Sequence, residues 1–235
     1  MRRPTIGAAD TKWSPLIWRQ ILLLFLFNLL LFIPLIFFNI SYEELLIAFE
    51  LDVPEHNGFD NYDSLWTFWL AAGIVAPIVE ELIFRGWLRG TPRQISMLVS
   101  IVAAVILLVV FAEPIRDLPL SARRFLLFAI LAGIVGLYLE IFFRTRANAK
   151  PIWFFERYFP FIFWTVAAVF GLLHMTNYEG GALLTTVPMV LPQLLAGPLL
   201  AFARLRFGLR ASILLHSALN SSVVLIAAIA VWLES

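Results

Sequence analysis

The chain has 235 residues, of which 61% are hydrophobic and 14% are charged, and its formal net charge at pH 7 is +1. Soluble domains carry about 25% charged residues, so this composition excludes an ordinary soluble globular protein. The small net charge, without a basic patch among aromatic residues, argues against a nucleic-acid partner. The chain has no cysteine, which excludes disulfides, thiolate metal sites and a cysteine nucleophile.

Long apolar runs separated by charged segments predict an all-α fold, a polytopic transmembrane helical bundle. We expect about seven spans, with roughly six to eight as the range, in a single domain over residues 16–235 that follows a basic tail over residues 1–15. The first span is too long for a signal peptide and lacks a small-x-small cleavage site, so we expect the chain to retain it. The expected spans lie near residues 18–38, 64–87, 95–111, 125–143, 152–174, 182–202 and 211–232.

Three local features modify this pattern. Pro34 is expected to kink the far end of the first span. In the acidic segment that follows, residues 39–63, Ser41-Tyr-Glu-Glu44 resembles a capping box and predicts a separate interfacial helix over residues 42–51. The sixth span is expected to be bent because it contains three prolines, Pro188, Pro192 and Pro198.

The basic residues gather in alternate connections between the spans. The N-terminal tail with Arg19, together with residues 85–93, 144–150 and 204–210, holds thirteen of the seventeen Lys and Arg residues. Basic connections tend to be cytoplasmic, so we expect a multi-pass cell-membrane protein with its N-terminus in the cytoplasm. Seven spans would then place the C-terminus outside.

Two adjacent acids stand out inside the second span. Burying a single charge in hydrocarbon costs at least about 2.5 kcal/mol, so a chain that keeps Glu80 and Glu81 there is expected to use them. Glu81 and Arg85 are four residues apart, on one helix face and in the favourable acid-before-base order. We therefore expect Arg85 to neutralise Glu81, and Glu80 to be the acid or base that works. The alternative is that Glu80 and Glu81 belong to an ion-pair cluster with a purely structural role.

Polar residues in two later spans complete a candidate site. His174 ends the fifth span, and His216 and Asn220 lie four apart on one face of the seventh. A lone histidine in a span often only packs against a neighbouring helix, but an acid pair with two histidines and an amide is harder to explain by packing. One carboxylate with imidazoles and an amide suits hydrolysis of an amide bond by activated water. A metal site built from scattered Glu and His ligands stays open.

These residues resemble three ordered motifs of the CAAX protease and bacteriocin-processing family of intramembrane glutamic proteases. The motifs are Glu80-Glu81-Leu-Ile-Phe-Arg85, Phe170-Gly-Leu-Leu-His174 and His216-Ser-Ala-Leu-Asn220. The resemblance implies that Glu80 activates water with help from His174, while His216 and Asn220 bind the oxyanion and Glu81 and Arg85 shape the first motif. It implies no cofactor and no metal, and a membrane-anchored protein or peptide as the substrate.

The resemblance also divides the chain. The family core would cover about residues 65–94 and 152–225, leaving an extra helical hairpin over about residues 95–143. Two other functions stay open: a non-catalytic immunity or binding protein of the same fold, and a proton-coupled transporter with Glu80 and the histidines as a relay. Measured along straight helices, Glu80 lies roughly 14 Å from Arg89 and His174 roughly 26 Å from Arg157. The motifs therefore meet only if spans are tilted, broken or sunk to different depths.

Overall fold

The computed structural model describes residues 14–56, 64–100 and 150–234, and the single residues 102, 103, 106, 119, 122, 133 and 135. In this part of the chain every regular element is a helix except two short strands. Five of its helical segments are long and apolar enough to cross a membrane, which confirms a polytopic helical architecture. The expected basic tail and most of the expected third and fourth spans lie outside the described residues, although residues 92–100 are helical.

The first helix is longer than the sequence predicts. Ser14 caps it by accepting a hydrogen bond from the Ile17 amide, and α1 then runs unbroken from Pro15 to Ala48, through Pro34. The prediction of a separate helix over residues 42–51 is therefore wrong. The Ser41 pattern lies inside a helix whose amides already have partners, and Asn39 beside it donates its side-chain amide to the Met189 carbonyl 3.3 Å away.

The second span joins three helical pieces end to end. A capping box at Ser64 opens α2 (Leu65–Phe68), which continues as a π-helix, η2 (Trp69–Val75), and then as α3 (Ala76–Arg85). A π-helix of seven residues is unusual, and such segments often occur at functional sites. It lies directly before the helix that carries the acid pair.

The later spans match the sequence expectations in their order and in the expected bend. Helix α6 (Trp153–Leu173) ends in a short 3-10 helix, η3 (His174–Asn177). The proline-rich span is broken into α7 (Leu183–Thr186), a 3-10 turn η4 (Val187–Val190) and α8 (Leu191–Phe207). Gly208, with a φ of 97°, closes α8, and α9 (Leu209–Glu234) follows at once.

Two short strands, which the sequence did not predict, pair outside the helices. Strand β1 (Glu55–His56) pairs antiparallel with β2 (Tyr178–Glu179), so His56 lies opposite Tyr178 and their rings meet edge to face at 5.1 Å. Burial and then the charge of Glu43 raise the pKa of the Tyr178 phenol, whereas partial desolvation lowers the pKa of the His56 imidazole. His56 is therefore a ring-packing residue of this small sheet.

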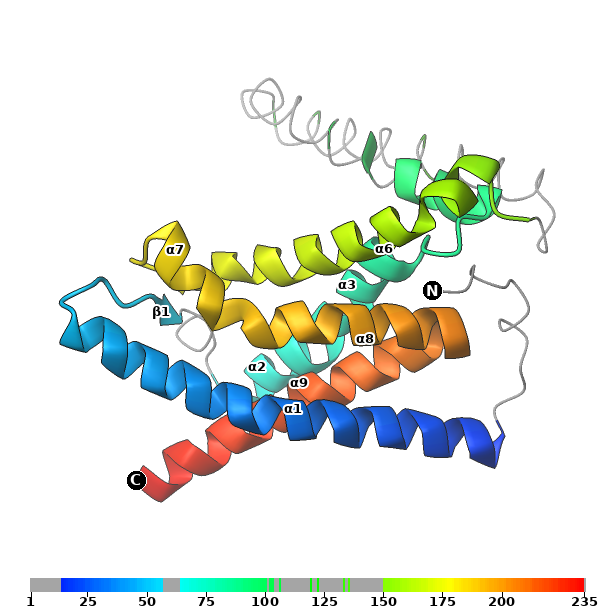
Figure 1. Ribbon diagram of the computed structural model, residues 1–235. Helices are drawn as coiled ribbons and strands as arrows, with labels where there is room; N and C mark the ends of the chain where they lie inside the picture. Colours follow the sequence, from blue (N-terminus) through cyan, green and yellow to red (C-terminus); the bar gives the residue numbers. More distant parts are fainter. Residues whose placement is uncertain are drawn as a thin grey trace. The chain divides into compact units, whose positions relative to one another are not determined.

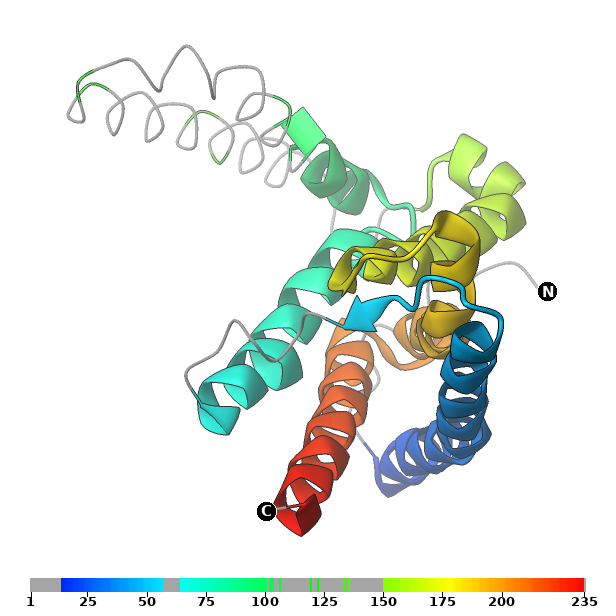
Figure 2. The same cartoon turned by 90° about the vertical axis from the view of Figure 1, so that its left-hand side faces the viewer.

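The described residues fall into two compact units. The first comprises the residues up to Arg85 together with those from Phe159 onward, and the second comprises the residues between Arg85 and Phe159. In the first unit α8 and α9 lie side by side with α1 against both, and η2 and α3 run along α9 (Figures 1 and 2). The apolar core lies where these helices meet. Its buried members are Ile21, Phe170, Ala196, Leu200, Ala203, Phe207, Ala211, Leu215 and Leu219.

Glycines let α6 approach α8 closely. A Cβ added to Gly171 would lie 2.7 Å from the Leu194 Cα, and one added to Gly197 would lie 2.8 Å from the Ala167 carbonyl oxygen. The two backbones therefore come nearer than any larger residue would permit, a common device where membrane helices pack. This close packing holds the helix that carries the second motif.

Candidate active site

The guanidinium of Arg85 and the carboxylate of Glu81 form a fully buried ion pair. Arg85 Nη1 lies 2.5 Å from Glu81 Oε1, and both side chains have no exposed surface. The guanidinium also stacks on the Phe170 ring, with 4.0 Å between its carbon and the ring centre, and reaches the Gly197 carbonyl at 3.5 Å. The expected pairing of Glu81 with Arg85 is thus present, and it is anchored to two further helices.

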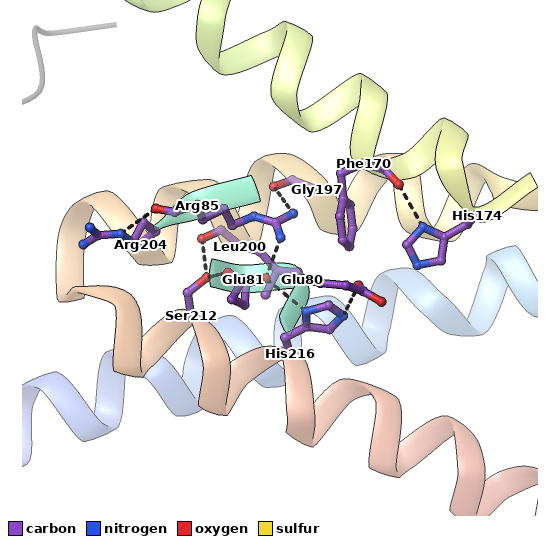
Figure 3. A network of polar contacts seen from close by, with 10 residues as sticks. All are labelled: Glu80, Glu81, Arg85, Phe170, His174, Gly197, Leu200, Arg204, Ser212 and His216. Atoms are coloured by element: carbon purple, nitrogen blue, oxygen red, sulfur yellow. Dashed lines mark hydrogen bonds and ion pairs between the residues drawn. The ribbon is translucent and has the colours of Figure 1, made fainter. Parts of the chain in front are cut away.

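Two residues of α9 donate to the same carboxylate. The Ser212 hydroxyl binds Oε2 of Glu81, and His216 Nδ1 lies 3.0 Å from Oε1 (Figure 3). Because an ionised carboxylate can only accept, Nδ1 of His216 carries the hydrogen in this contact. Together with Arg85, these residues give the Glu81 carboxylate three hydrogen-bond donors, so both of its oxygens are already bonded within the protein.

The neighbouring acid is placed differently. The Glu80 side chain keeps 28% of its surface exposed and points away from the Glu81 carboxylate, toward the other side of the His216 ring (Figure 3). Its Oε2 lies 3.7 Å from His216 Nε2, and this buried oxygen makes no hydrogen bond within the described residues. The imidazole of His216 thus bridges the two acids, with a different nitrogen facing each.

The second motif reaches the site through an aromatic ring. Phe170, only 1% exposed, meets the rings of His174 and His216 edge to face, at 4.8 and 5.6 Å between ring centres. His174 Nδ1 lies 2.8 Å from the Phe170 carbonyl oxygen, which can only accept, so the hydrogen sits on Nδ1 and Nε2 stays free.

Asn220 is bonded away from the acids. Its side-chain amide donates to the Ala72 carbonyl at 2.8 Å, inside the π-helix η2. In the same π-helix, the Trp69 indole donates to the Ser221 hydroxyl of α9 at 3.0 Å. Of the six residues singled out in the sequence, the structure joins Glu80, Glu81, Arg85 and His216 by direct contacts and links His174 through Phe170. Asn220 shares the face of α9 with His216 but binds the π-helix.

Comparison with known families decides the relationship. The model of the family described as Type II CAAX prenyl endopeptidase Rce1-like matches two overlapping segments, residues 62–146 and 119–222, which together cover more than half of the chain. The chain belongs to this family. The resemblance seen in the three motifs is thereby confirmed. No curated protein and no solved structure matches the chain.

Sequence motifs alone missed several partners of the site in this Rce1-like chain. Ser212 binds Glu81, Arg204 Nε donates to the Arg85 carbonyl at 2.8 Å, and Gly197 accepts from the Arg85 side chain. In the sequence Arg204 is one of the basic residues of the 204–210 connection, so nothing marks it as a buried donor, and a single serine or glycine gives no signal either. Within the described ranges no group of three or more His, Asp or Glu side chains forms a metal-binding cluster.

Proposed function

We propose that this chain is an intramembrane endopeptidase that hydrolyses a peptide bond of a membrane-anchored protein or peptide with a water molecule activated by Glu80. The observation that carries the proposal is the unequal placement of the two adjacent acids. Glu81 is enclosed and accepts from three donors, while Glu80 is partly exposed and has an uncommitted oxygen beside His216. An acid that is free to take a proton, next to an imidazole, is the arrangement that general base catalysis requires.

The proposed reaction begins when Glu80 removes a proton from water as the water oxygen attacks the carbonyl carbon of the substrate. The free Nε2 of His174 is suited to accept a hydrogen bond from the same water. The negative oxygen that forms would be bound by His216, when Nε2 carries a proton, and by the second amide hydrogen of Asn220. Glu80 then returns its proton to the leaving nitrogen as the carbon–nitrogen bond breaks. In known cases each oxyanion donor contributes about 3–4 kcal/mol.

The same proposal places the protein in the lipid bilayer. The five described spans, with two more from the expected hairpin at residues 95–143, give seven. We propose a cytoplasmic N-terminus and an outside C-terminus on the distribution of basic residues, which a reporter fused after the last residue would test. The family is described as acting on CAAX prenyl proteins, so a substrate with a lipid-modified tail is the first to try.

The test compares membranes that contain wild type with membranes that contain Glu80→Gln at matched expression. Mass spectrometry of protein termini should find new C-termini with wild type only, and in H₂¹⁸O these termini should carry ¹⁸O because water is the nucleophile. Glu44→Gln, which alters an exposed acid of α1, is the matched control and should behave as wild type. Identical termini for wild type and for folded Glu80→Gln would instead favour a non-catalytic binding or immunity protein.

A further inference from the structure

Ser212 is a fully buried polar residue that lies outside the three motifs. It sits one helical turn before His216 on α9, so both side chains face α3. Its hydroxyl oxygen reaches two acceptors, Oε2 of Glu81 and, at 2.9 Å, the Leu200 carbonyl oxygen of α8. A buried hydroxyl between an acid and a helix backbone is a costly arrangement unless its hydrogen bonds serve the structure or the reaction.

The hydroxyl has one hydrogen and therefore donates to one acceptor at a time. The Leu200 carbonyl is in the interior of α8, where the amide one turn later is its ordinary partner. The ionised carboxylate of Glu81 is the stronger acceptor because charge-assisted hydrogen bonds are roughly twice as strong as neutral ones. The hydrogen of Ser212 is thus directed to Glu81.

This bond controls how the Glu81 carboxylate is turned. The terminal torsion of a glutamate is soft, so a carboxylate held at one oxygen can rotate. Arg85 and His216 both contact Oε1. Ser212 is the described residue that holds Oε2, and with both oxygens held the carboxylate plane is fixed. Oε1 then stays on Nδ1 of His216.

We propose that Ser212 is a positioning residue that acts through Glu81 on His216. By fixing the carboxylate it keeps the hydrogen of neutral His216 on Nδ1, so that Nε2 is the nitrogen presented to Glu80 and to the reacting atoms. This is how a carboxylate orients the imidazole of a serine protease triad, here with a serine hydroxyl behind the carboxylate. The inference rests on the proposed function only for its kinetic consequence.

The charged and titratable groups around His216 come from two elements. Glu80 and Glu81 of α3 contact its imidazole, Arg85 of α3 shares Oε1 of Glu81 with it, and His174 belongs to η3. Removal of the Ser212 hydroxyl changes none of these charges. It frees the Glu81 carboxylate to rotate, so Nδ1 loses its fixed partner and neutral His216 samples both tautomers. The proposed oxyanion contact needs a proton on Nε2 while Nδ1 stays bonded to Glu81, so that step slows, while binding of the substrate is unaffected.

The test is ¹⁵N nuclear magnetic resonance of protein labelled at its three histidines, with His216 assigned from the spectrum of His216→Gln. In wild type with neutral His216, we expect Nδ1 to show a bonded hydrogen and Nε2 a free lone pair. Ser212→Ala should give averaged shifts for the two nitrogens. Ser222→Ala is the matched control, because the Ser222 hydroxyl on the same helix bonds back to the Ala218 carbonyl at 2.8 Å. It should leave the His216 signals unchanged.

These spectra need no substrate, so they separate this inference from the proposed function. A wild-type His216 with its hydrogen on Nε2 would overturn the inference even if Ser212→Ala fails to fold, and so would a folded Ser212→Ala with unchanged shifts. With a cleavable substrate, kcat of Ser212→Ala should fall roughly 10- to 100-fold, the range for groups that orient histidines in metal sites, at unchanged KM. Ser212→Thr, which keeps the hydroxyl, should recover much of that loss. An equal rise in KM would contradict the positioning role.

Discussion

At the scale of single residues, Arg85 is the side chain on which the site depends most. It is the largest of the fully buried side chains in the described residues, and its guanidinium contacts three helices through Glu81, Gly197 and Phe170. A flat, delocalised cation can bind a carboxylate and stack on a ring at once, which a lysine ammonium cannot. The choice of arginine at this position therefore follows from geometry as well as charge.

Replacing Arg85 with Lys tests this view. Lys can keep the ion pair with Glu81, but it loses the stacking on Phe170 and the bond to Gly197, so we expect the free energy of unfolding to fall by about 1–3 kcal/mol. Thermal unfolding in detergent measures the change. The control is Arg206→Lys at an exposed position of α8, which should stay within about 0.5 kcal/mol of wild type. Equal effects of the two substitutions would show that only the charge of Arg85 matters.

The residues of the site differ in how far the sequence predicts them. The pair of Glu81 and Arg85 follows from helical spacing alone, and so does the shared face of His216 and Asn220. Ser212 and Gly197 could not be found this way, because their roles depend on how α8 and α9 pack against α3. The bond of Asn220 to Ala72 was missed for the same reason, since it depends on the π-helix that lies beside α9.

At the scale of elements, the π-helix explains how the acid pair is aimed. A π-helix adds a residue to the turn, which rotates all that follows it relative to a continuous α-helix. Side chains of α9 hold this segment at two points, the Ala72 carbonyl and the Trp69 indole, and Gly73 leaves room for the Ser221 hydroxyl. The rotational position of α3 is thus set by the helix that carries the third motif.

The close packing of α6 on α8 can be tested at Gly171. An alanine there would place its Cβ 2.6 Å from a Leu194 side-chain carbon and 2.7 Å from the Leu194 Cα, so the helices must separate. We expect the free energy of unfolding to fall by about 1–3 kcal/mol, with a loss of cleavage because α6 carries Phe170 and His174. The exposed Ala168→Val on the same helix is the control and should be close to neutral. A Gly171→Ala protein as stable as wild type would contradict the close approach.

The sequence predicts elements better where periodicity and proline dominate than where a local signal competes with a long helix. The breaks in the sixth span follow from its prolines. The Ser41 pattern predicted a separate helix after the first span, yet α1 continues through it to Ala48. Within an apolar helix the backbone amides are better satisfied by continuing than by stopping, and a side-chain cap gains little there. The pairing of β1 with β2 depends on distant residues and has no local signal.

At the scale of the whole molecule, three motifs far apart in the sequence meet at one buried ring. Phe170 of the second motif contacts Arg85 of the first and His216 of the third. Distances counted along straight helices predict that Glu80 and His174 lie at different depths in the membrane. The described spans are not straight α-helices, since the second contains η2 and the fifth ends in η3 at His174. Broken spans are therefore part of how this family member assembles its candidate site.

The division of roles between the two acids is tested most directly by comparing Glu80→Gln with Glu81→Gln, because these adjacent substitutions are chemically identical. For each protein, cleavage of a membrane-anchored substrate and the midpoint of thermal unfolding are measured in one preparation. We expect Glu80→Gln to abolish cleavage and to unfold as wild type does. Glu81→Gln leaves Arg85 buried without its carboxylate, at a cost of about 3–5 kcal/mol, and should lose both stability and cleavage. Cleavage by Glu80→Gln at the wild-type rate, or equal destabilisation by both, would contradict the division of roles between the two acids.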